Sequence, residues 1–136
     1  MGFSQYLSEK VMGQFLNGTA YTWPTTVYVA LFTVQPSGGT GGTEADYTGY
    51  ARVAMTVGTT DFTAVSTSGE VKNAIAVNFP TNTGTAQTVV GYGFFDASTA
   101  GNLLTDNTLT SSQTINNGAS ASFAAGALTL TATINP

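Results

Sequence analysis

The sequence predicts a mainly β fold, specifically a single antiparallel β-sandwich or jelly-roll-like domain with one N-terminal helix. Short segments alternate apolar and polar residues with a period of two, and Gly, Asn and Pro recur between them. A helical period occurs only in the opening segment. The 136 residues suffice for one domain over residues 1–136 with a buried core. No repeat of 20–50 residues and no heptad pattern is visible.

The opening segment, residues 1–18, predicts the helix. Ser4 is suited to cap its N-terminus by accepting a hydrogen bond from a first-turn amide, and Asn17-Gly18 is a favourable helix stop. The apolar residues at helical spacing are Leu7, Val11, Met12, Phe15 and Leu16. This stripe is expected either to cover one end of the core or to dock on a neighbouring subunit.

The next two segments predict a central strand and a loop. Residues 25–34 place Val27, Val29 and Leu31 on one face, while the opposite face is also apolar. A strand with two apolar faces is expected to be covered on both sides. Residues 36–49 follow as a Gly-rich loop, which is expected to be mobile or to contact a partner.

Residues 50–57 predict a further strand, and Arg52 within it is the sole arginine of the chain. It is expected to project from the less buried face and to pair with an acidic residue. Tyr and Arg are enriched at the energetic centres of protein interfaces. We therefore predict that Tyr47, Tyr50 and Arg52 form part of an interface with a partner chain.

Five further strands are predicted in the rest of the chain. Residues 73–80 are expected to direct Ile75, Val77 and Phe79 to one face. In residues 87–97, two glycines on one face indicate a bulge or a closely packed neighbour. Asn117-Gly118 predicts a hairpin turn between strands at 108–115 and 119–124. The final run predicts a strand whose inward residues are Leu128, Leu130, Ala132 and Ile134.

The composition favours a protein that is packed against other chains. Only 7% of residues are charged, with three basic and seven acidic side chains, whereas about a quarter is usual. Thr fills 25 positions. A surface of Thr, Ser, Asn and Gly suits a protein that packs against other copies of itself or against a partner chain. Thr is also common in strands for reasons of β propensity alone.

The same composition argues against catalysis. His and Cys are absent, which removes imidazole catalysis, thiol nucleophiles and the usual zinc ligands. We therefore predict no enzymatic activity, no catalytic, cofactor-binding or metal-binding residues, and no cofactor. A net charge of −4 argues against nucleic-acid binding. No apolar run reaches the roughly 18 residues that a membrane span requires, so no membrane association is expected.

Several blocks of the chain resemble small tailed-bacteriophage virion proteins, which are commonly labelled tail fibre or virion structural proteins. The blocks are MGFSQYLSEKVMGQFL, TTVYVALFT, YARV, FFDASTAGNLL and SFAAGALTLT, and they occur in this order from Met1 to Thr131. The resemblance implies a virion component, made in the host cytoplasm, whose partners are other capsid or tail proteins. The family that the chain resembles has no catalytic motif. A fibre protein of this length would be one module of a fibre, such as an adaptor or a tip.

Three functional classes follow. The leading expectation is a capsid cement or decoration protein that bridges capsid subunits and forms a homo-oligomer. The first alternative is a tail fibre or tail adaptor module. The further alternative is a carbohydrate-binding β-sandwich that contacts the host surface, for which Tyr21, Trp23 and Tyr47 are the candidate stacking residues, unless these aromatics belong to the core.

Overall fold

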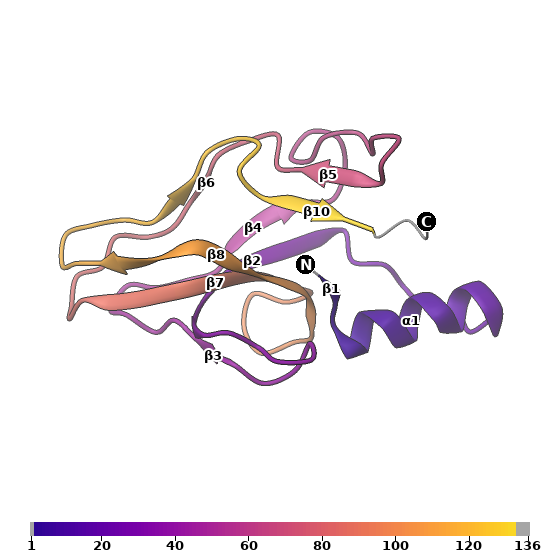
Figure 1. The fold of residues 1–136 in the computed structure, drawn as a ribbon, viewed down its shortest axis with the longest axis horizontal. Helices are drawn as coiled ribbons and strands as arrows, with labels where there is room; N and C mark the ends of the chain where they lie inside the picture. Colours follow the sequence, from indigo (N-terminus) through magenta and orange to yellow (C-terminus); the bar gives the residue numbers. More distant parts are fainter. Residues whose placement is uncertain (1, 133–136) are drawn as a thin grey trace.

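The computed structural model describes residues 2–132 and confirms a mainly β fold with antiparallel sheets and one helix near the N-terminus (Figure 1). The elements are β1 (Gly2–Phe3), α1 (Gln5–Leu16), β2 (Thr26–Val34), β3 (Thr43–Glu44), β4 (Val53–Thr56), β5 (Glu70–Lys72), β6 (Val77–Asn78), β7 (Gln87–Phe95), β8 (Leu103–Ile115), β9 (Ser122–Phe123) and β10 (Thr129–Thr131). No helix within residues 2–132 has both the length and the apolar character needed to cross a membrane.

A six-stranded antiparallel sheet forms the larger layer, in the order β1-β8-β7-β2-β3. Strand β2 pairs with β7 along one edge. Along its other edge, the first half of β2 pairs with β4 and the second half pairs with β3. The strand therefore has neighbours on both sides, and its residues from Val29 to Phe32 are all buried. The prediction of a central strand covered on both faces is confirmed, and the apolar composition of both faces is its cause.

Two glycines of β7 allow other groups to approach its backbone closely, as their position on one face predicted. A Cβ atom at Gly93 would lie 2.7 Å from the Phe32 ring and 3.0 Å from the Thr105 carbonyl oxygen. A Cβ atom at Gly91 would overlap the side chain of Gln35. The register between β7 and β8 also shifts near Gly91, so the predicted irregularity is present.

The second layer consists of two short ribbons, β5–β10 and β6–β9, which lie on one side of the large sheet (Figure 1). Val77, Phe79 and Leu128 from this layer join the same buried cluster as Val29 and Phe94 from the large sheet. The core thus lies between two β layers, which is the arrangement of a β-sandwich.

Two fully buried asparagines stabilise the irregular parts of this second layer. The side-chain amide of Asn73 donates to the carbonyls of Ile75 and Ala124, and its oxygen accepts from the Leu128 N–H (2.8 Å). Asn82 likewise donates to the Ile115 carbonyl (2.8 Å). Each side chain replaces backbone pairing that short strands cannot supply, which satisfies groups that water does not reach.

The hairpin predicted at Asn117-Gly118 is wrong. A turn does occur there, because Gly118 has φ +82° and the Ala119 N–H donates to the Asn116 carbonyl. However, only Gly118 has a positive φ, whereas a hairpin of type I′ needs two such residues. The Gly118 N–H donates instead to the Asn82 carbonyl (2.7 Å), and the chain crosses to the second layer, where β9 pairs with β6.

Three other predicted strands are shorter than expected. Of residues 50–57 only Val53–Thr56 is a strand, so Arg52 lies just before β4 and not within it. Within 73–80 only Val77–Asn78 is a strand, and Ile75 is exposed because the chain bends around Asn73. In the final run Leu128 is buried as predicted and Leu130 is half-buried, but Ala132 is exposed. The predicted inward position of Ile134 lies outside the described residues.

The loop predicted at residues 36–49 contains β3 and packs on its own chain. Pro36, Ala45 and Tyr47 are buried, and the absent side chain of Gly39 would lie 2.7 Å from the Ser4 Cα atom. Gly39 has φ +74°, a conformation that glycine adopts without strain. The loop therefore supports the point at which α1 begins.

Candidate assembly interface

Helix α1 begins on the sandwich and leads away from it (Figure 1). Ser4 caps it as predicted, since its Oγ accepts from the Leu7 N–H (3.0 Å), and the Ser4 N–H donates to the Leu104 carbonyl of β8. At its other end Gly18 has φ +66°, and the Thr19 N–H donates to the Gly13 carbonyl. The helix is thus fixed at its start, and its end is closed by local bonds alone.

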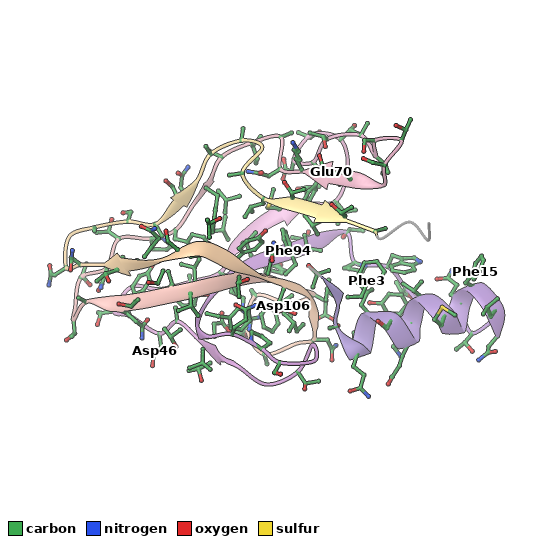
Figure 2. All side chains as sticks on the ribbon, viewed as in Figure 1. Phe3, Phe15, Asp46, Glu70, Phe94 and Asp106 are labelled. Carbon is green, nitrogen blue, oxygen red and sulfur yellow. The ribbon has the colours of Figure 1, made fainter. Side chains whose placement is uncertain are left out.

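The predicted apolar stripe of α1 is buried only at its beginning. Leu7 is buried and Val11 is half-buried, whereas Met12, Phe15 and Leu16 are 52%, 78% and 65% exposed. Figure 2 shows Phe15 near the end of the helix that is farther from the sheets. Among residues 2–132, the second half of the stripe therefore remains largely uncovered.

An apolar groove of about 560 Å³ opens beside the start of α1. It is lined by the helix start, the segment that joins α1 to β2, the β5–β10 ribbon and β8. None of the described residues that line it carries a charge. Four exposed large apolar side chains belong to this lining: Phe3, Trp23, Val57 and Val65. Such a surface can bind another apolar surface, since burial of apolar area is favourable.

Aromatic rings connect the helix to the rim of the groove. Tyr21 packs edge-to-face against Tyr6 of α1 and against Trp23, with a centroid distance of 4.7 Å in the second pair. The Lys10 ammonium lies 5.2 Å from the centre of the Tyr6 ring. These contacts fix the orientation of Trp23, which remains exposed at the groove.

The predicted interface residues Tyr47, Tyr50 and Arg52 make contacts within their own chain. Tyr47 is only 5% exposed, and its hydroxyl donates to the Pro80 carbonyl (2.8 Å). The Tyr50 hydroxyl donates to Glu44 (2.8 Å) and accepts from the Leu31 N–H (3.1 Å). Burial, and then the neighbouring Glu44, raise the pKa of Tyr50 well above its usual value, so this hydroxyl stays protonated.

Arg52 is the centre of this network. Its guanidinium binds both carboxylate oxygens of Glu44 (2.8 and 2.7 Å) and donates to the carbonyls of Ala97 and Ala100. It also lies 3.6 Å from the centre of the Phe95 ring. The predicted acidic partner is therefore present, but the side chain is only 5% exposed rather than projecting freely. Arg52 joins β3, β4 and the loop after β7.

The interface role predicted for these three residues stays a prediction, because the structure assigns them only contacts within the chain. The helical stripe was recognised from the sequence, including its possible docking function. Phe3, Val57 and Val65 were not, since they come from separate segments and only the tertiary fold brings them to one groove. Within residues 2–132 no group of three acidic side chains is placed to hold a metal ion.

Comparison with known proteins gives the family. No curated protein matches the chain. The chain does match the family model described as Podophage GP4 fiber I protein gp80, over residues 2–131. This match covers nearly the whole sequence and agrees with the resemblance to tailed-phage virion proteins. The chain belongs to the Podophage GP4 fiber I protein gp80 family, a family of structural phage fibre proteins.

Proposed function

We propose that this protein is a fibre or adaptor module of the phage tail, and that it joins other virion chains through the apolar end formed by α1 and the groove. The observation that carries the proposal is the concentration of exposed apolar side chains at this end, in a chain of the fibre I family. Exposed apolar patches of this kind usually mark interaction sites.

The position of this surface supports a fibre module over a capsid cement protein. A cement protein bridges neighbouring capsid subunits and therefore needs contact surfaces on at least two sides. In the described part of the chain, the large exposed apolar side chains gather mainly at the helix and the groove. Attachment at one end leaves the rest of the sandwich free, which suits a module that projects from the particle.

Binding without chemistry is the mode of action that these features support. Among residues 2–132 no charged side chain lines the groove, and the family is one of structural proteins. The carbohydrate-binding alternative has less support, because Tyr47 is buried while Tyr21 and Trp23 lie at 84° to each other and do not form one flat platform. The net charge of −4 supports protein partners over nucleic acid.

The direct test is to locate the protein on intact particles. Gold-labelled antibody in electron microscopy, combined with copy number from quantitative gels, should show a small number of copies confined to the tail. Hundreds of copies spread over the head would instead establish the cement role. Absence of the protein from purified particles would contradict both roles.

A further inference from the structure

We propose that the groove of one copy receives the exposed half of α1 from a second copy, so that two chains associate by exchanging helices. This inference rests on the proposed function, because it names the partner of the same apolar end. The occupant is residues 11–16 of another identical chain, and the recognition is that of an apolar helix face in an apolar groove.

The distribution of exposed apolar side chains is the first argument. Among residues 2–132, nine large apolar side chains are exposed, and seven of them lie on the helix or at the groove. The helix contributes Met12, Phe15 and Leu16, and the groove contributes Phe3, Trp23, Val57 and Val65. Exposed apolar side chains that gather in this way usually mark an interaction site, so this surface is expected to be covered in the assembled state.

The geometry of α1 keeps the exposed end of the stripe away from the groove of its own chain. Leu7 lies in the groove lining, and the helix leads away from that point. With a rise of 1.5 Å per residue, Phe15 lies about 12 Å farther along the helix axis than Leu7. A continuous helix cannot fold back over this distance. Within residues 2–132 the exposed half is therefore left accessible to another molecule.

The two surfaces match in chemistry. Residues 11–16 contain no charged side chain, and the groove lining that the structure describes contains none either. The groove volume of about 560 Å³ lies in the range of sites that enclose a sizeable ligand. A partner with a charged face would lose the hydration of its charges here without gaining an ion pair.

The placement of both surfaces on one chain favours a second copy as the partner. Helix and groove are contiguous at Leu7, so a two-fold axis beside them would let each helix lie over the groove of the other chain. A two-fold interface joins two chains and leaves no surface for a third, and each contact occurs twice in the dimer. One substitution in the helix then removes two contacts from the dimer.

Sedimentation velocity of the full chain tests the exchange. Phe15→Glu and Val65→Glu should each weaken self-association roughly 100-fold or more, because each removes one apolar contact per chain and introduces a charge. Val34→Glu is the matched control, since Val34 is also exposed but lies outside the groove, and it should associate like the unchanged chain. Circular dichroism checks that each variant is folded.

Cysteine cross-linking tests the specific pairing, because the natural chain contains no cysteine. A mixture of Phe15→Cys and Val65→Cys chains should form a mixed disulfide dimer under mild oxidation. A mixture of Phe15→Cys and Val34→Cys chains should not. Equal cross-linking in both mixtures would overturn the exchange.

A chain that stays monomeric up to about 100 µM, a concentration that would reveal even weak dimers, would also overturn the exchange. The proposed function would survive that result if the protein were still found on the tail and Phe15→Glu prevented its incorporation. If the chain formed the dimer but was absent from the particle, the proposed function would fail instead.

Discussion

Replacement of Arg52 by alanine tests whether its network holds the edge of the large sheet. The guanidinium makes four hydrogen bonds, two of them to Glu44, and its side chain is almost completely buried. Breaking a buried ion pair costs about 3–5 kcal/mol, because the remaining charge loses its partner. Glu44 is partly accessible, so water can solvate it in the variant. We therefore expect Arg52→Ala to lower the free energy of unfolding by about 3 kcal/mol.

Urea denaturation, with the slope of the transition compared between variants, measures this loss, and thermal denaturation should show a fall of about 10 °C. Arg52→Lys should recover only part of the stability, since one ammonium cannot bind Glu44 and both carbonyls together. Lys72→Ala is the matched control. Lys72 pairs with Glu70 at 3.3 Å on the surface, and its loss should cost less than about 0.5 kcal/mol. Equal losses for Arg52→Ala and Lys72→Ala would refute the reasoning.

Three further predictions concern the core and its polar groups. Asn73→Ala should lower the free energy of unfolding in urea by about 2–4 kcal/mol, because it leaves buried backbone groups unpaired. Asn78 is exposed, so Asn78→Ala should have little effect. Gly93→Ala should lower the free energy of unfolding by at least about 2 kcal/mol, because the new methyl group meets backbone and ring atoms. Gly2→Ala should lower it by almost nothing, because the space around Gly2 is open. Similar melting temperatures for the two variants would contradict the close packing at Gly93. The pKa of Tyr50 is raised in the folded state, so the unfolded chain loses the Tyr50 proton at a lower pH than the folded chain does. The contribution of Tyr50 to stability should therefore be constant below about pH 10 and should fall at higher pH. Tyr50→Phe should make the decline in stability between about pH 9 and pH 11 less steep.

The sequence predicted best those elements whose pattern is set by local chemistry. The capping of α1 by Ser4 and the central position of β2 follow from one side chain or from one apolar run. The close approach at Gly93 follows likewise from the absence of a side chain. In each case the information lies within a few residues, and the fold has no reason to override it.

The elements that were missed depend on contacts between distant segments. Asn117-Gly118 has the composition of a hairpin, but Asn82 from another loop binds the Gly118 N–H and the chain crosses to the second layer. Arg52 is buried because Glu44 and the loop after β7 surround it, which residues 50–57 alone do not indicate. The same holds for the groove, whose lining comes from segments spread over most of the chain.

The central position of β2 also has a consequence for how this protein folds. Residues 28–32 pair with residues 91–95, so β2 cannot complete its hydrogen bonding until β7 has been synthesised. Closing so long a loop costs entropy before any contact is gained, and folding rates fall as such non-local pairings increase. During this interval both apolar faces of β2 are accessible to other unfolded chains. Refolding should therefore be slow and its yield should fall as protein concentration rises, which favours dilute refolding or coexpression with chaperones when the protein is produced.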